Sequence, residues 1–271
     1  MIKFVSLDLE TSGFQEGAEV LELGVTYQHG AVFTCWSRMF GNERPIPPAA
    51  RAVHHIWPED LVGLQTFAVH GAHAMSELVP EDAEFVVAHS AEYEQRYLGQ
   101  LVRGLPWVCT YKAALRVWPE APTHSNAGLM YWLMDQGLWV DNFSREMSVP
   151  THRAAPDSYI TACICRVLLQ HATLEQLIQW TREPRYITRV PFGDSKGKLF
   201  SEVDEGLLHW ILRRDFDADI MAAANRELDR RIAERERLER ERQAPLFSGI
   251  DQAGSQDLTG YDRIDIWPEK P

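Results

Sequence analysis

The chain has 271 residues, of which 45% are hydrophobic and 24% are charged, so its composition suits a globular protein with one medium domain and a smaller second one. No apolar stretch reaches the length of a membrane span, and the first residues do not follow the pattern of a secretory signal. We therefore expect a cytoplasmic protein with no membrane partner. The formal net charge of −12 argues against broad electrostatic binding of nucleic acid, but not against holding a nucleic-acid end through metal ions and local contacts.

The hydrophobic pattern predicts three strands at the start of the chain, joined by short turns as in an antiparallel meander. Prolines then interrupt the chain, and a mostly helical stretch is followed by alternating short strands and helices. The last long helix of the main domain begins near Pro156, a residue that the first turn of a helix tolerates. The expected strands lie at 2–9, 20–26, 32–36, 84–89 and 107–110, and the expected helical segments lie at 48–80, 91–103, 111–118 and 126–137.

This order of elements predicts an α/β fold in which helices cover both faces of a mixed sheet. The composition changes near residue 182, because residues 182–198 carry five Lys or Arg residues against two acids. An amphipathic helix with Trp210 follows, and then a stretch in which Arg and Glu residues stand one helical turn apart. The predicted parts are a main domain at 1–180, an accessory module at 186–228, a charged helix at 229–247 and a flexible tail at 248–271.

Two carboxylates stand at the end of the first predicted strand. Side chains alternate between the two faces of a strand, so Asp8 and Glu10 share one face. Neighbouring carboxylates at the mouth of a buried strand repel each other and lose hydration, which is unfavourable unless cations neutralise them. Oxygen-only sites of this kind suit Mg²⁺ or Mn²⁺. The alternative interpretation is a strand end that continues into a solvated loop.

A centre with two metal ions needs about four carboxylates from different elements, because one strand does not surround two ions. Glu92 and Glu94 open the helix after the strand that ends at His89, and Asp157 falls in the first turn of the last long helix. His152 lies on the loop just before that helix, where its imidazole would take a proton from an attacking water. Taken singly, each residue also has an ordinary interpretation, as a solvated helix residue, a partner of the helix dipole or a surface histidine.

Three segments together resemble the three motifs of the DEDDh family of 3′–5′ exonucleases. They are Asp8-Leu9-Glu10-Thr11, Ala88-His89-Ser90-Ala91-Glu92-Tyr93-Glu94 and His152-Arg153-Ala154-Ala155-Pro156-Asp157. The resemblance covers roughly residues 1–172 and implies an RNase H-like fold, a mixed five-stranded sheet flanked by helices, with a small C-terminal accessory module. Further segments resemble a DNA-degrading branch of the family, namely residues 53–56, 107–112, 116–119, 125–126 and 192–198 with the helix around Trp210.

The resemblance also implies a reaction, the hydrolysis of DNA from a 3′ end with release of nucleoside 5′-monophosphates in DNA repair or replication. It assigns Asp8 to both of two Mg²⁺ or Mn²⁺ ions and makes His152 the general base, while Glu10 and Asp157 complete the ligands of one ion. Glu94 stands where the family usually has Asp, an acid that acts mainly through metal-bound water. We expect an active enzyme with an altered metal preference. The residues that the resemblance places against the terminal nucleotide are Thr11, His54, Ile56 and His89. The alternative for His54 and Ile56 is that they pack in a local loop core.

DNA ends are the favoured substrate, and trimming of RNA 3′ ends is the alternative, because the sequence does not show the contacts that recognise a 2′-OH. A second alternative is a module that binds nucleic-acid ends or a clamp and has lost its catalytic site. Glu94 is the feature that supports this alternative. A third alternative is a proofreading subunit that acts with a polymerase.

Two further segments predict contacts with partners. The basic residues Arg189, Lys196 and Lys198 would contact a nucleic-acid backbone, and the alternative is an ordinary solvated linker. The segment Gln243-Ala244-Pro245-Leu246-Phe247 is similar to the pentapeptide with which bacterial DNA enzymes bind the sliding clamp. In that mode Gln243 makes polar contacts, while Leu246 and Phe247 fill a hydrophobic pocket. The alternative is that the Leu-Phe pair folds back onto the domain.

Overall fold

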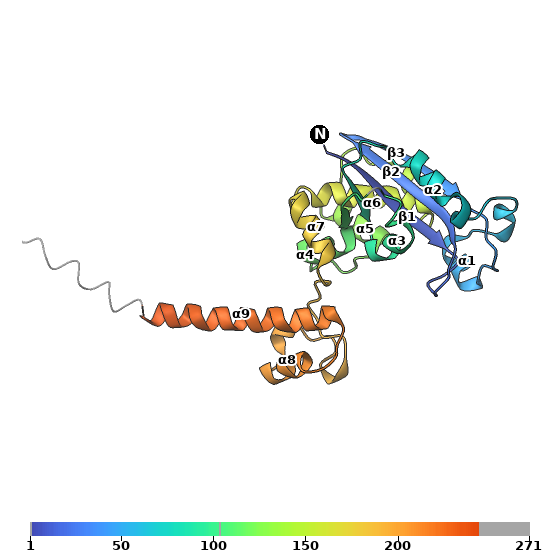
Figure 1. Cartoon of the computed structure of the whole chain (residues 1–271). Coiled ribbons are helices and arrows are strands. Elements are labelled where there is room, and N and C mark those ends of the chain that lie inside the picture. The colour runs from blue at the N-terminus through green and yellow to red at the C-terminus, as the bar shows by residue number, and fades with distance from the viewer. Residues whose placement is uncertain (1, 103, 244–271) are drawn as a thin grey trace, which may run out of the picture. The chain divides into compact units, whose positions relative to one another are not determined.

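The computed structural model describes residues 2–102 and 104–243, and the chain divides into two compact units, Met1–Arg189 and Val190–Pro271. The first unit holds the sheet and its helices (Figure 1). It continues past the predicted domain end at residue 180, because helix α7 (Leu174–Arg182) packs against the last strand of the sheet. Within the described part of the chain, no helix combines the length and the apolar character that crossing a membrane requires.

Among the described residues, five strands form one mixed sheet in the order β3-β2-β1-β4-β5. Strands β1 (Lys3–Thr11), β2 (Val20–His29) and β3 (Val32–Met39) pair antiparallel. Strands β4 (Phe85–Ala88) and β5 (Trp107–Cys109) continue the sheet from β1 in parallel. The predicted α/β fold with a mixed five-stranded sheet is therefore confirmed.

The apolar residues of β1 explain why this strand is the centre of the sheet. Phe4 faces a core formed with helices on one side, and Val5 and Leu7 face a second core on the other side. All three side chains are fully buried. A strand covered on both faces reads as a nearly continuous hydrophobic run, so the polar residues at its carboxyl end stand out.

The helices cover both faces of the sheet, and their bounds differ from the prediction mainly at their ends. The predicted helix at 91–103 ends early, at Leu98 just before Gly99. The predicted helical stretch at 48–80 contains three separate segments. The bounds are α1 (Pro48–His54), η1 (Pro58–Leu61), α2 (Phe67–Leu78), α3 (Ala91–Leu98), α4 (Thr110–Val117), α5 (Asn126–Asp135), η2 (Glu146–Ser148) and α6 (Ala154–Leu168).

The second unit is described through the end of one long helix. It contains η3 (Gly193–Ser195), η4 (Phe200–Glu202), α8 (Glu205–Leu212) and α9 (Ala218–Gln243). Helix α9 runs without a break across the predicted boundary between residues 228 and 229, and Glu227 pairs with arginines on its next turn. The predicted clamp-binding residues Leu246 and Phe247 and the predicted tail at 248–271 lie outside the described residues.

Candidate active site

Three carboxylates from two elements converge at the carboxyl end of β1. One oxygen from each of Asp8, Glu10 and Asp157 can be chosen so that all three atoms lie within 4.8 Å of one another. Strand β1 supplies Asp8 and Glu10 on one face, and the first turn of α6 supplies Asp157. The structure thus brings together the two sequence motifs that lie furthest apart in the chain.

The close approach of α6 to the sheet depends on Gly24. This residue lies opposite Asp8 in the β1–β2 register. A Cβ atom at this position would lie 1.9 Å from the backbone oxygen of Ala154, at the start of α6. Only glycine permits this contact, and the contact is what lets the first turn of α6 reach the end of β1.

Glu94 lies beside this group but is not part of it. It sits in the first turn of α3, its side chain is buried, and its charge raises the pKa of Asp8. Burial raises the pKa of Glu94 itself to about 8. Its Oε2 atom is buried without a hydrogen-bond partner in the described structure. The fourth acid of the predicted set therefore faces the centre from a second helix.

The charged forms of the three convergent carboxylates are disfavoured, and a nearby positive charge would stabilise them. Burial, and then the charges of Asp157, Glu10 and Glu94, raises the pKa of Asp8 well above its usual range. Burial and the charge of Asp157 raise the pKa of Glu10 to about 8, and burial raises the pKa of Asp157 to about 6. Asp157 Oδ1 is also buried without a hydrogen-bond partner among the described residues. These oxygen donors fit a hard divalent cation such as Mg²⁺ or Mn²⁺.

His152 lies on the loop that enters α6. Its backbone has a φ of 61°, in the left-handed region, and its N–H group donates a hydrogen bond of 3.0 Å to Asp157 Oδ2. The residue is exposed, so the loop is tied to the carboxylates while the imidazole stays accessible. The next residue, Arg153, forms an ion pair with the buried Glu22 of β2. Sequence reasoning missed Glu22, although an acid inside the apolar run of β2 was a visible signal.

A hollow of about 480 Å³ adjoins Glu10. Its walls are the end of β1, the loop at 11–15, and helix α1. Thr11 and His54 line it, as the prediction of a nucleotide-contacting role requires. Ile56 is not among the residues that line this hollow, and it packs in a local core with Leu21 and Leu61. Its predicted contact with the substrate stays a prediction.

His89 is hydrogen-bonded inside the protein, and its predicted contact with the substrate stays a prediction. Its Nε2–H group donates a hydrogen bond of 2.7 Å to the backbone oxygen of His124. Its Nδ1 atom accepts a hydrogen bond of 2.9 Å from the Thr110 hydroxyl. Burial lowers the pKa of His89 to about 4, so the ring is neutral near pH 7. Both ring nitrogens are thus used inside the protein, and His89 braces the second motif rather than facing the hollow.

Two aromatic residues at the hollow were missed from the sequence. The Tyr93 hydroxyl hydrogen-bonds with Thr11 and donates to the backbone oxygen of Gly13. Phe14 is 87% exposed, and its ring packs edge-on against Tyr93. The signal in the sequence was the position of Tyr93 directly before Glu94 in the second motif.

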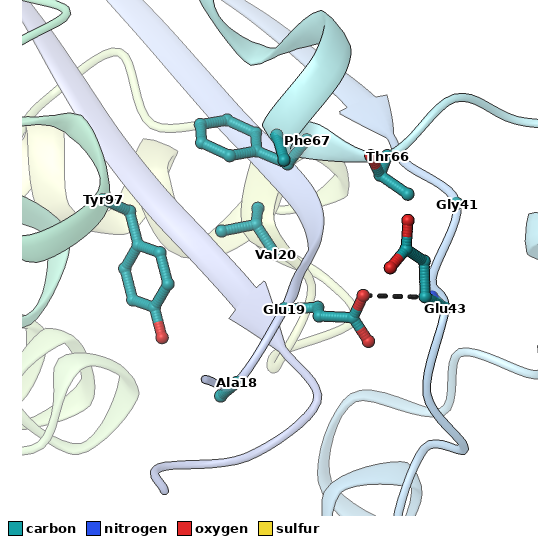
Figure 2. Close-up of a pocket in the computed structure, with 9 residues that line it drawn as sticks. Ala18, Glu19, Val20, Gly41, Glu43, Thr66, Phe67 and Tyr97 are labelled. Carbon is teal, nitrogen blue, oxygen red and sulfur yellow. Dashed lines mark hydrogen bonds between the residues drawn. The ribbon is translucent and has the colours of Figure 1, made fainter. Parts of the chain in front are cut away.

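A smaller hollow of about 220 Å³ lies where β2 begins, beside α2 (Figure 2). Its acid Glu19 accepts hydrogen bonds of 3.0 Å from the backbone N–H groups of Glu43 and Arg44. Phe67 and Tyr97 supply much of its apolar wall. None of the described residues that line this hollow has a buried side-chain oxygen without a hydrogen-bond partner, in contrast to Asp157 and Glu94 near the end of β1.

The predicted basic residues are divided between the two units. Arg189 is the last residue of the first unit, whereas Lys196 and Lys198 belong to the second. Both lysines are exposed and form no ion pair with a described residue. The structure of each unit therefore leaves their predicted contact with nucleic acid as a prediction.

Comparison with known proteins gives matches that extend over most of the chain. The sequence is 30% identical over 219 residues to exodeoxyribonuclease 10 of Escherichia coli strain K12, covering 76% of this chain and 88% of that protein. The structure resembles a solved exonuclease X in complex with 5′ overhanging duplex DNA, with a TM-score of 0.53 and 26% identity. That match covers 67% of this chain and 99% of the other. No family model matches the sequence.

The sheet order and the carboxylates at the end of β1 agree with these matches and define the class, an RNase H-like 3′–5′ exonuclease of the DEDDh type. Within that class, the chain belongs to the exodeoxyribonuclease 10 (exonuclease X) family.

Proposed function

We propose that the chain hydrolyses DNA from the 3′ end and releases nucleoside 5′-monophosphates, with two Mg²⁺ or Mn²⁺ ions at the end of β1. The observation that carries this proposal is the convergence of Asp8, Glu10 and Asp157 within 4.8 Å, in a buried setting that raises the pKa of all three acids. Membership of the exodeoxyribonuclease 10 family supports DNA as the substrate.

The carboxylates hold the ions, which when bound neutralise the scissile phosphate and the charges that develop on it. By the resemblance, Asp8 would be a ligand of both ions, and Glu10 and Asp157 would complete the ligands of one. Glu94 would contribute from α3 through water. His152 accepts a proton from the attacking water, because its loop is tied to Asp157 and its ring is exposed.

The terminal nucleotide occupies the hollow next to Glu10. Thr11 and Tyr93 form its polar edge, and His54 lies on the α1 side with a pKa that burial lowers. The His54 Nδ1 atom accepts the backbone N–H of Ile56 at 2.9 Å, so its Nε2 carries the proton. That Nε2 is buried without a hydrogen-bond partner among the described residues, which suits it to donate to a sugar or phosphate oxygen.

The exposed lysines of the second unit, Lys196 and Lys198, would contact phosphates of a nucleic acid. The same contact is proposed separately for Arg189, the last residue of the first unit. Near them in the chain, Phe192 stacks on Phe216 with ring centroids 4.7 Å apart, and Trp210 packs edge-on against Phe216. The segment at 243–247 would bind a sliding clamp. Work in the cytoplasm, trimming of RNA ends and action beside a polymerase also stay predictions.

A time course on 3′-recessed DNA and on matched single-stranded DNA and RNA, each labelled at the 5′ end, tests the proposal. We expect a ladder that shortens from the 3′ end, that depends on Mg²⁺ or Mn²⁺, and that forms faster on DNA. EDTA should stop it, and Asp157→Asn should abolish it. Equal rates on RNA would favour the RNA-trimming alternative, and a wild-type chain as inactive as Asp157→Asn would favour the decayed module.

A further inference from the structure

Glu22 and Arg153 form a two-point ion pair beside the carboxylate centre. Arg153 Nε donates to Glu22 Oε2 at 2.8 Å, and Arg153 Nη2 donates to Glu22 Oε1 at 3.0 Å. The backbone N–H of Ala154 donates a third bond of 3.3 Å to Glu22 Oε2. Glu22 is 2% exposed, and it lies opposite Glu10 in the β1–β2 register. A fifth acid thus borders the centre with both of its oxygens already engaged.

These bonds fix the loop on both sides of one strained residue. His152 has a left-handed backbone, which a side-chain-bearing residue adopts only where the surroundings impose it. On one side its N–H group is bonded to Asp157, and on the other side Arg153 and Ala154 are bonded to Glu22. The planar guanidinium and the carboxylate meet in a fork that defines an orientation as well as a distance.

We propose that Glu22 and Arg153 are positioning residues that hold the loop of His152 over the carboxylate centre. This inference rests on the proposed function, in which His152 accepts the proton of the attacking water. The pair touches neither the water nor the phosphate in this account. It keeps Glu22 from competing as a metal ligand, and it keeps the imidazole within reach of the reacting water.

The test combines Arg153→Ala, Arg153→Lys and the neutral pair Glu22→Gln/Arg153→Gln, each made in the wild-type and the His152→Ala background. We expect Arg153→Ala to lower kcat by roughly 10- to 100-fold with KM changed by less than about threefold, since a displacement of about 1 Å costs on the order of 100-fold in rate. Arg153→Lys should recover only part of kcat. The neutral pair should regain much of the Tm that Arg153→Ala loses, because it leaves no buried unpaired charge, without regaining kcat.

The His152→Ala background separates positioning from general support of the fold. There Arg153→Ala should lower kcat by less than about twofold, because residues that act as a unit are not additive. The affinity for Mn²⁺, measured by calorimetry, should change by less than about threefold in Arg153→Ala if Asp157 stays in place. A matched control is Arg116→Ala, which removes the partner of Glu183 in an ion pair of 3.0 Å elsewhere in the same unit. It should lower Tm and leave kcat unchanged.

Three results would overturn the inference. One is a full effect of Arg153→Ala in the His152→Ala background, and another is wild-type kcat in the neutral pair. The third is full activity of His152→Ala alone, which would remove the assignment of the base and with it this inference. The first two results leave the proposed function intact, so the two kinds of failure are distinguishable.

Discussion

Two regions of the molecule, α9 and the end of β1, are rich in charged residues. Several acids of α9 have basic partners, whereas those at the end of β1 have acidic neighbours. On α9, Glu227 receives the guanidinium groups of Arg230 and Arg231 at 2.8 and 2.7 Å, and these bonds lower its pKa to about 2. At the end of β1, burial and the charges of neighbouring acids raise the pKa of Glu10 to about 8. Charges that are already paired stabilise a helix, whereas buried acids without partners mark a place where a cation belongs.

The largest effect is expected from Asp8→Asn. This change removes the acid at the centre of the cluster, so activity on 3′-labelled DNA should fall roughly 1,000-fold or more, the scale of several kcal/mol of transition-state stabilisation. The Tm of the metal-free chain should rise, because a buried and repelling charge is gone. Glu234→Gln on α9 is the matched control and should leave activity unchanged. Comparable losses of activity in both variants would show that the acids at the end of β1 are no more important for the reaction than those of α9.

His152→Ala should lower kcat by about 10²- to 10⁴-fold, the usual contribution of a general base. Binding of 3′ ends in Ca²⁺, followed by fluorescence anisotropy, should change little, because the carboxylates and the hollow remain. A loss of end binding that matches the loss of turnover would show that His152 serves the substrate rather than the water.

Glu94 is a buried acid that does not belong to the group of Asp8, Glu10 and Asp157. Glu94→Ala should lower kcat about 100-fold, while Glu94→Asp should keep activity within about tenfold and change the ratio of rates in Mg²⁺ and Mn²⁺. Steady-state rates in each metal give the answer. Wild-type activity as low as that of Glu94→Ala, with recovery in Glu94→Asp, would mean that Glu94 does not complete the centre.

The stability of the metal-free chain should depend on pH with a definite sign. Burial raises the folded-state pKa of Glu94 to about 8, so the folded chain binds more protons than the unfolded chain between about pH 4.5 and pH 8. Stability contributed by this group therefore falls as pH rises through that window. The slope of Tm against pH should be shallower in Glu94→Gln, and Mg²⁺ should raise the wild-type Tm more at pH 8 than at pH 5.

The smallest effect is expected on α9. Glu227→Gln weakens the bonds to two arginines, so the second unit should lose about 2 kcal/mol of stability while the rate of DNA hydrolysis stays unchanged. Chemical denaturation followed by the helical signal in circular dichroism, to which the 26-residue α9 contributes, measures this loss. A fall in the hydrolysis rate would show that α9 takes part in the reaction.

The sequence allowed the fold to be predicted because its signals are local. Alternation in β1 placed Asp8 and Glu10 on one face, and the tolerance of helix starts for Pro156 located α6. The sequence did not show that the side chain of Ile56 packs in a local core or that His89 is hydrogen-bonded inside the protein, and the predicted substrate contacts of both stay predictions. Periodicity reports which face a residue occupies, and it does not report what else that face touches.

The residues that were missed are those whose role depends on contacts across the fold. The role of Glu22 is visible only when the fold brings Arg153, 131 positions away, into contact with it. The role of Gly24 is visible only when α6 packs on β2. Tyr93 likewise becomes part of the site through its hydroxyl contact with Thr11. Strand and helix patterns do not predict these pairings, because they arise from tertiary packing between elements that lie far apart in the sequence.

Titration of Mn²⁺ into the otherwise metal-free chain measures directly whether the acids at the end of β1 bind cations, since it does not depend on the substrate. Isothermal titration at pH 7.5 should show two ions per wild-type chain and a strong loss of binding in Asp8→Asn, while Glu234→Gln binds as wild type. Unchanged binding in Asp8→Asn, or no binding in the wild type, would contradict the account that the acids at the end of β1 form a cation site.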